Sequence, residues 1–316
     1  YNLTLNNLDA MFASTMLSRP KADDEFRVLL IGDSSTWGWF LQPDETYAAG
    51  INARAATLSD GRRVVAYNVG YPVLSLTKDL ILLDYAMQYE PDMVVWLVTA
   101  QSMRYEDDRG APVQTAAPVS EWPPHYLTSL TETYTLNVDV ADEPPPSLLG
   151  GTIVDQRRDL ANLLRLQVYG GAWGATRVDH RVPETFDLRR SDLSDSEAWG
   201  GFEEPTALTV DSLAFDVLTA GVDLVGDTPL LLVNEPIFIS DGENSDVRYN
   251  SFYPRWAYDG YRDALADLAA ENDWTYADWW DMLPPDQFTD TPVHVTPEAA
   301  EIISERLLDF ILQETE

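Results

Sequence analysis

The chain has 316 residues, 45% of them apolar and 23% charged, so it can bury a sizeable core and falls outside the disordered and collagen-like classes. Its 53 acidic residues against 20 basic ones give a formal net charge of −33, which disfavours binding to nucleic acid because that affinity comes mainly from cationic contacts to phosphates. The absence of cysteine rules out disulfides, thiol nucleophiles and cysteine-ligated zinc.

The first third of the chain alternates short apolar runs with a helical pattern. Residues 1–25 form a polar lead-in segment with scattered apolar positions. The apolar runs at 26–31, 64–68 and 93–99 predict buried strands, and leucines at helical spacing predict a helix over 75–90. Strands that alternate with helices in this way indicate a parallel sheet built from right-handed crossovers.

A proline-rich region then breaks the alternation, which resumes after it. We predict that residues 103–205 form an insertion within a single domain over 26–316, with an internal helix over 153–168 and an acidic loop over 187–204. Beyond the insertion the pattern predicts helices over 208–225, 259–271 and 297–313, and strands over 230–234 and 274–278.

A serine lies at the end of the first predicted strand. Residues 32–35 read Gly-Asp-Ser-Ser, and in an open parallel sheet the carboxyl ends of the strands form the ligand crevice. Ser34 is therefore well placed to project its hydroxyl into a site. Ser and Asp at such a turn are also typical of a simple helix cap, so this turn alone does not identify a nucleophile.

A catalytic serine needs a base, and the sequence offers three histidines. His125 lies in the proline-rich insertion and His180 lies between charged residues, which favours solvated positions for both. His294 lies in a loop just before the last predicted helix, with Asp290 four residues upstream. A base that is oriented by an acid and faces a hydroxyl is the arrangement that activates serine for acyl transfer.

Two further blocks extend this pattern. Residues 68–70 read Asn-Val-Gly at the end of the second predicted strand, and Pro-Asp at 91–92 introduces the third. Together with the turn at 32–35 and with His294, and in this order, these blocks resemble those of the SGNH (GDSL-like) hydrolase superfamily. The resemblance covers both flanks of the predicted insertion and leaves the insertion itself uncovered.

The resemblance implies an α/β fold of the flavodoxin-like type, a three-layer sandwich with a central parallel sheet and a large insertion, and it implies serine ester chemistry. Ser34 would attack an acyl carbonyl, His294 would take up its proton and later return it, and Asp290 would orient His294. The amides of Ser34 and Gly70, together with the side chain of Gln101, would form the oxyanion hole.

Two positions depart from the pattern of the superfamily. Gln101 stands where the superfamily has the asparagine of its oxyanion hole, and a glutamine amide is one methylene longer. The position of the usual acid is Thr291, whereas Asp290 lies one residue earlier. Either Asp290 reaches the imidazole through an altered turn, or a backbone carbonyl orients His294.

Aromatic and arginine side chains supply the candidate substrate contacts. Trp37 closely follows the serine, and Arg248 and Tyr253 lie in an aromatic cluster beyond the predicted strand at 230–234. Aromatic faces with polar groups nearby can hold a sugar or an acyl chain. We therefore expect these three residues to bind the substrate.

The outcome of the reaction stays open between two enzymes and a binding module. If water accepts the acyl group, the protein is an acyl or acetyl esterase, with carbohydrate esters among its candidate substrates. If a sugar hydroxyl accepts it, the protein resembles the polysaccharide O-acetyltransferases of the same fold. The departures at Gln101 and Thr291 also leave a non-catalytic sugar-binding module open.

No cofactor or metal is expected, because the sequence has no nucleotide-binding fingerprint and no His-rich metal spacing. The acidic loop at 241–246 does not match the spacing of an EF-hand. The longest apolar runs fall far short of the ~20 residues that a membrane helix needs. We expect an address outside the cytoplasm; the start at Tyr1 fits removal of an upstream signal or anchor and fits an arbitrary boundary equally well.

The acid excess leads to a prediction about salt. A strongly hydrated acidic surface repels itself, and added salt screens that repulsion. We therefore expect the melting temperature to rise when NaCl is added, as measured by circular dichroism over a salt series. A melting temperature that does not respond to NaCl would contradict this interpretation of the composition.

Overall fold

One parallel sheet of five strands forms the centre of the part of the chain that the structure describes. The computed structural model describes residues 8–13, 15–104, 125–136, 182–183 and 185–315, together with Arg157, Ala161, Leu164 and Val168. The strands are β1 (Glu25–Ile31), β2 (Arg63–Asn68), β3 (Met93–Val98), β4 (Leu230–Asn234) and β5 (Thr275–Asp278). Their order, β2-β1-β3-β4-β5, is that of flavodoxin-like sheets, as predicted.

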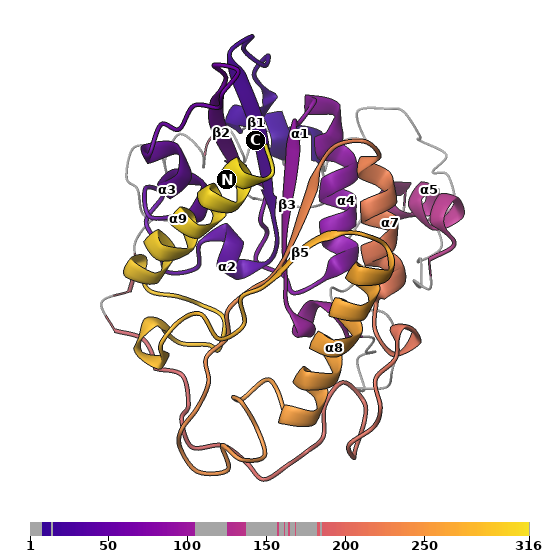
Figure 1. Ribbon diagram of the computed structural model, residues 1–316, viewed down its shortest axis with the longest axis vertical. Helices are drawn as coiled ribbons and strands as arrows, with labels where there is room; N and C mark the ends of the chain where they lie inside the picture. Colours follow the sequence, from indigo (N-terminus) through magenta and orange to yellow (C-terminus); the bar gives the residue numbers. More distant parts are fainter. Residues whose placement is uncertain are drawn as a thin grey trace.

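Helices cover both faces of this sheet (Figure 1). Leu29 and Ile31 of β1 point into a core shared with α1 (Leu8–Ala13), α4 (Leu76–Ala86), α7 (Phe215–Val225) and α8 (Arg255–Glu271). Val28 and Leu30 point to the opposite core, shared with α3 (Tyr47–Ala53) and α9 (Pro297–Gln313). Because side chains alternate along a strand, a buried strand with two apolar faces joins both layers, and the three-layer sandwich is confirmed.

Other helical segments lie between these elements in the chain. Two are α-helical and the others are 3₁₀ turns: α2 (Ser34–Trp37), α5 (His125–Tyr134), η1 (Met16–Ser18), η2 (Met87–Tyr89), η3 (Ala100–Met103), η6 (Val210–Ser212) and η7 (Pro285–Gln287).

Two predicted helices differ from the observed ones at their starts. The helix predicted over 208–225 begins at Phe215, because a capping box of Thr209 and Ser212 closes a separate 3₁₀ turn before it. The helix predicted over 259–271 begins earlier, at Arg255, directly after Pro254, and its first backbone bond runs from Tyr258 N–H to the Pro254 carbonyl. The last helix has its predicted bounds, with Thr296 as its N-cap.

The lead-in segment takes part in the core. Leu8, Phe12 and Leu17 are each no more than 2% exposed. The ring of Phe12 packs on Tyr85 and Tyr89, with centroid distances of 4.7 and 5.7 Å. The apolar positions scattered through this polar segment therefore bury one side of α1 against the end of α4 and η2.

Much of the predicted insertion lies outside the described residues. Of the helix predicted over 153–168, the structure describes Arg157, Ala161, Leu164 and Val168, and all four are helical. The acidic stretch at 187–204 is a loop, as predicted. His180 and the side chain of His125 are not among the described residues.

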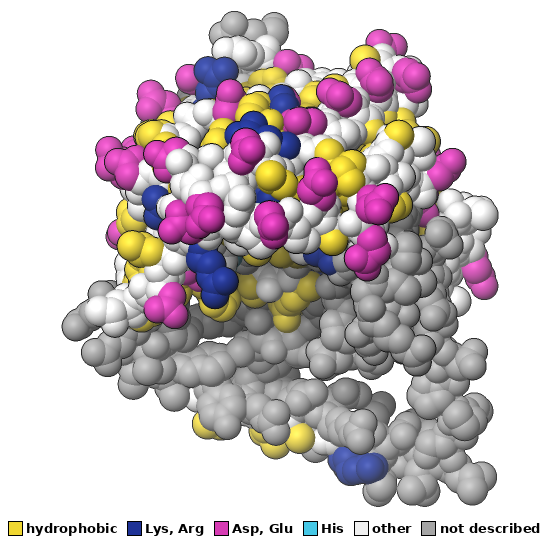
Figure 2. Space-filling model, turned by 90° about the horizontal axis from the view of Figure 1, so that it is seen from below, with side chains coloured by type: hydrophobic (Ala, Val, Ile, Leu, Met, Phe, Trp, Pro, Cys, Tyr) yellow, Lys and Arg dark blue, Asp and Glu magenta, His cyan; other side chains and the backbone are white. Residues whose placement is uncertain are grey.

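The described surface carries the acid excess in a dispersed form. Figure 2 shows Asp and Glu side chains scattered over the face in view, with fewer Lys and Arg between them. Within the described residues, no helix is both long and apolar enough to cross a membrane.

Candidate active site

The turn after β1 holds Ser34 at the start of α2. Asp33 is the N-cap of this helix, and its Oδ1 accepts a hydrogen bond from Ser35 N–H at 2.8 Å. Gly38, in the left-handed conformation, ends the helix after a single turn. The local sequence thus fixes a short helix whose first residue, Ser34, lies just beyond the carboxyl end of β1.

The loop after β2 packs closely against this turn. The Asn68 side-chain amide donates to the carbonyls of Thr36 and Trp37 at 2.8 and 3.2 Å. A Cβ added at Gly70 would lie 2.6 Å from the backbone nitrogen of Trp37, so any larger residue would push the two loops apart. Gly70 N–H donates to Asn68 Oδ1 at 2.9 Å.

The loop before α9 presents His294. Thr289 N–H donates to the His294 carbonyl at 2.8 Å, and Phe288 forms an antiparallel bridge with Val295, so the loop closes like a short hairpin. The hydroxyl of Thr291 accepts a hydrogen bond from His294 N–H at 3.2 Å. This side chain holds the tight turn that brings Asp290 back beside the imidazole.

Three side chains from the two ends of the chain form one hydrogen-bonded series. His294 Nε2 lies 2.7 Å from Ser34 Oγ, and His294 Nδ1 lies 2.8 Å from Asp290 Oδ1. With the proton on Nδ1, the imidazole donates to Asp290 and accepts from the Ser34 hydroxyl. Of the two alternatives left open by the sequence, the geometry is that of an altered turn, with the carboxylate of Asp290 on the imidazole.

Trp39 covers one face of this imidazole. The indole stacks on His294 with a centroid distance of 5.6 Å and an interplanar angle of 22°. Trp37 and Phe40 pack on Trp39, each with a centroid distance of 5.8 Å. Trp39 is itself 37% exposed, so an aromatic surface borders the site. The signal in the sequence that could have placed Trp39 beside the site is its position five residues after Ser34.

The loop after β3 contributes Gln101. Its backbone N–H donates to the Tyr253 hydroxyl at 3.1 Å, and this hydroxyl also lies 2.6 Å from Thr99 Oγ1. The side-chain Oε1 of Gln101 is buried and has no hydrogen-bond partner among the described residues. The proposed parts of Gln101 and Gly70 in an oxyanion hole stay predictions.

In two of the residues predicted to bind substrate, the polar groups form hydrogen bonds with other groups of the protein. Tyr253 is fully buried and holds the Gln101 loop. Arg248 is 6% exposed, and its guanidinium donates to the carbonyls of Ser196, Asn250 and Ser251. These contacts order the loop after β4, and binding of substrate by either residue stays a prediction.

A buried ion pair lies behind the site. Lys78 is 0% exposed, pairs with Asp79, and donates to the carbonyls of Gly32 and Tyr71 at 2.7 and 3.2 Å. It thereby ties the loop after β1 to the loop after β2. Trp96 donates to the second oxygen of Asp79 at 3.2 Å. Sequence reasoning did not single out Lys78, although it is one of two lysines in the chain.

The carboxyl group of Asp79 leads to a prediction about pH. Burial raises the pKa of Asp79 from 3.8 to about 6, although Lys78 opposes the shift. The folded protein therefore holds this proton more tightly than the unfolded chain, and stability falls as the pH rises from about 4 through 6. We expect Asp79 to lower the free energy of unfolding, measured by urea denaturation, by on the order of 1 kcal/mol between pH 5 and pH 7.

The same comparison in 1 M NaCl separates this group from the acidic surface, because salt screens exposed charges far more than buried ones. Asp79→Asn, which cannot titrate, should make the pH dependence shallower than that of the parent. The same pH dependence in the parent and in Asp79→Asn, both in 1 M NaCl, would contradict the raised pKa of Asp79.

A cavity of about 360 Å³ lies beside β2, away from the Ser34–His294 pair. Side chains of the lead-in segment, α3 and β2 line it, and neither Ser34 nor His294 is among them. In the part of the chain that the structure describes, no group of three or more His, Asp or Glu side chains is arranged to hold a metal ion.

No protein-family model and no curated protein sequence matches this chain, but solved structures do. A carbohydrate acetylesterase family member from Sinorhizobium meliloti is 12% identical, with a TM-score of 0.39 over 90% of this chain and 96% of that one. A lipase/acylhydrolase from Enterococcus faecalis is 12% identical, with a TM-score of 0.44 over 91% and 96% of the two chains. A psychrotrophic esterase from Pseudoalteromonas sp. is also 12% identical, with a TM-score of 0.43 over 92% and 98%.

Each of these matches to an esterase or acylhydrolase extends over about 90% of this chain. At these identities and TM-scores the matches carry no argument about the reaction of this chain.

Proposed function

We propose that this protein is a serine-dependent ester hydrolase. The observation that carries the proposal is the series from Ser34 Oγ through His294 to Asp290, with distances of 2.7 and 2.8 Å between residues as far apart in sequence as 34 and 294. A hydroxyl, an imidazole and a carboxylate in this order are the parts that acyl transfer requires.

The reaction follows from the direction of these hydrogen bonds. Ser34 Oγ attacks the carbonyl carbon of the ester while His294 Nε2 takes its proton, which gives a tetrahedral intermediate with a negatively charged oxygen. The bond to the alkoxy group then breaks, and His294 returns the proton to the departing alcohol. Water attacks the resulting acyl-serine with the same proton transfers, and the acid and free Ser34 are released.

Asp290 supports the charged form of the base. When His294 carries two protons, the carboxylate accepts the bond from Nδ1–H and stabilises the imidazolium. Trp39 stacks on the same ring, and the face of an indole attracts a nearby cation. Both contacts favour the protonated imidazole that forms during attack. The buried setting of His294, which is 7% exposed, strengthens each of these interactions relative to water.

Backbone and side-chain amides at the strand ends would stabilise the oxyanion. The backbone N–H groups of Ser34 and Gly70 and the amide of Gln101 belong to the loops after β1, β2 and β3 respectively. In a parallel sheet these loops meet at one edge, which supports a shared role. For Gly70 this requires its N–H to turn from Asn68 Oδ1 or to be shared with it.

The test is release of acetate from a small aryl acetate by the purified protein, with and without an acetylated or free oligosaccharide. Hydrolysis that depends on Ser34 supports the esterase. Transfer of the acetyl group to a hydroxyl of the free oligosaccharide, in place of acetate release into water, would assign the acyltransferase. If a fluorophosphonate does not label Ser34 and the protein still binds oligosaccharide, it is a sugar-binding module.

A further inference from the structure

Glu235 is a carboxylic acid buried behind the nucleophile turn. It follows Asn234, the last residue of β4, and its backbone N–H donates to the carbonyl of Val98 at the end of β3 at 3.1 Å. The residue is 2% exposed. Its side chain reaches α2 at the same edge of the sheet, where the Ser35 hydroxyl donates to Glu235 Oε2.

The two oxygens of Glu235 have different surroundings. Oε2 accepts the bond from Ser35, whereas Oε1 is buried and accepts no hydrogen bond from any residue that the structure describes. A carboxylate oxygen removed from water without a donor is costly. If Oε1 carries a proton, however, it becomes a donor and needs only an acceptor nearby.

The groups that face Glu235 provide that acceptor and disfavour a negative charge. Asp33, the N-cap of α2, lies close enough for its negative charge to act on Glu235, and Asp79 of α4 adds a second negative charge nearby. Burial raises the pKa of Tyr47 and of Tyr253, and the charge of Glu235, which lies close enough to act on both hydroxyls, raises it further. Burial, followed by the charge of Asp33, raises the pKa of Glu235 well above its usual range. Where two buried carboxyl groups lie close together, their like charges favour holding one proton between them.

We propose that Glu235 is a neutral carboxylic acid that positions the nucleophile turn. Its Oε1–H donates to the carboxylate of Asp33, and its Oε2 accepts from the hydroxyl of Ser35. Because Asp33 also accepts from the backbone N–H of Ser35 at 2.8 Å, the three residues close a ring around the first turn of α2, which begins at Ser34. Glu235 touches no reacting atom, and this inference rests on the proposed hydrolase function.

The neutral state can be separated from an ionised one by two substitutions. Glu235→Gln keeps the same pattern, since the amide oxygen accepts from Ser35 and the amide nitrogen donates to Asp33, and it cannot ionise. Glu235→Ala removes the donor from Asp33 and leaves the Ser35 hydroxyl without its acceptor. An ionised, merely structural glutamate would be disrupted by both.

The kinetic test uses hydrolysis of an aryl acetate by the folded fraction of each variant. We expect Glu235→Ala to lower kcat about 10- to 100-fold with KM changed less than about twofold, because Ser34 is displaced from the imidazole. We expect Glu235→Gln to keep kcat within about threefold of the parent. Should Glu235→Ala fail to fold, Ser35→Ala removes the same bond with a smaller volume change and should lower kcat in the same direction.

Two further measurements report the protonation state of Glu235 and would not change if the residue served packing alone. The parent should lose kcat at alkaline pH as Glu235 ionises, and Glu235→Gln should keep its kcat over that range. The infrared difference spectrum of the parent minus Glu235→Gln at pH 7 should contain the carbonyl stretch of a protonated carboxylic acid. That band is observable whether or not the protein hydrolyses any ester.

The outcomes separate this inference from the proposed function. If the parent hydrolyses the ester and Glu235→Gln loses as much kcat as Glu235→Ala, or the infrared band is absent, the neutral positioning acid is overturned and the hydrolase stands. If the parent is inactive but the band is present, the hydrolase fails and the positioning role falls with it, while the neutral state of Glu235 is established.

Discussion

Ser34→Ala should abolish ester hydrolysis, with a loss in kcat on the order of 10⁴-fold or more. The substitution removes the attacking oxygen and leaves His294 and Asp290 in place. Ser34 is 7% exposed, and its hydroxyl bonds to His294, so its loss changes little else in the packing. The measurement is kcat and KM on an aryl acetate, with circular dichroism to verify folding.

His294→Ala should cost about as much as Ser34→Ala, and the double variant should be no worse than either single one. Residues that act in the same chemical step depend on one another. Once one of them is removed, removal of the second costs little more, so the two effects on kcat do not add. Asp290→Asn should cost less, on the order of 10²- to 10⁴-fold, because it leaves both the base and the nucleophile.

A matched control is Ser18→Ala, since Ser18 donates its hydroxyl to the Thr15 carbonyl on the surface, outside the site. It should keep the parent kcat. The proposed role of Ser34 fails if Ser34→Ala retains more than about a hundredth of the parent kcat, or if a fluorophosphonate labels Ser35 in place of Ser34. Ser35 is not expected to react, because its hydroxyl already donates to buried Glu235.

The fold was predictable wherever its signals are local. The last helix has its predicted bounds because its capping residue, Thr296, and Pro297 both act within the first turn of that helix. The start of α7 was mispredicted because two features set it. The capping box of η6 closes a separate 3₁₀ turn, and Ala214 N–H donates to the Met103 carbonyl of a different loop. The second contact is tertiary and leaves no pattern in residues 208–225.

Which side chains of the candidate site lie close together was easier to predict from the sequence than the geometry in which they lie. The end of β1 presents Ser34, and the loop before α9 presents His294 beside it. Whether Asp290 or a carbonyl faces the imidazole depends on a turn that Thr291 closes. Arg248 also follows a strand end, yet its side chain turns inward. Glu235 was missed because one acid among 53 acidic residues does not stand out, even directly after a strand.

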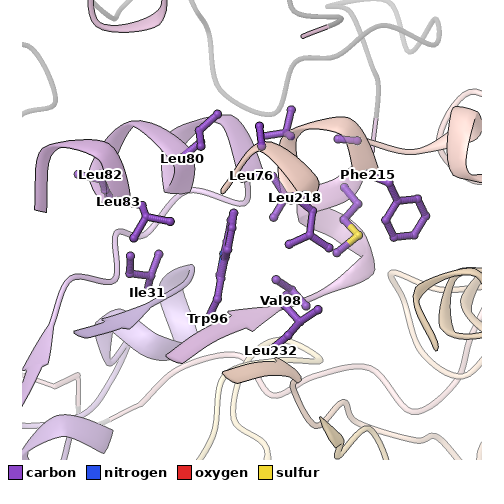
Figure 3. Close-up of a cluster of buried hydrophobic side chains, with 14 of the residues drawn as sticks. Ile31, Leu76, Leu80, Leu82, Leu83, Trp96, Val98, Phe215, Leu218 and Leu232 are labelled. Carbon is purple, nitrogen blue, oxygen red and sulfur yellow. The ribbon is translucent and has the colours of Figure 1, made fainter. Parts of the chain in front are cut away.

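Gly221→Ala should destabilise the fold, against the usual effect of this substitution in a helix. Gly221 lies within α7, where alanine ordinarily stabilises by about 0.5–1 kcal/mol. Here an added Cβ would lie 2.2 Å from Cζ3 of Trp96, a fully buried side chain of β3. Figure 3 shows that indole standing between α4 and α7, among Leu76, Leu80 and Leu218. We expect the free energy of unfolding, measured in urea, to fall by about 2–3 kcal/mol.

Gly260→Ala is the matched control, because it also lies within a helix, α8, but its added Cβ would meet Leu208 at an ordinary 3.6 Å. It should raise stability by about 0.5–1 kcal/mol. Trp96→Phe removes the ring that the new methyl group meets, so Gly221→Ala should cost less in that background than in the parent. An equal gain from Gly221→Ala and Gly260→Ala would mean that Trp96 can move aside, and that the close approach of α7 to β3 is not what requires glycine at 221.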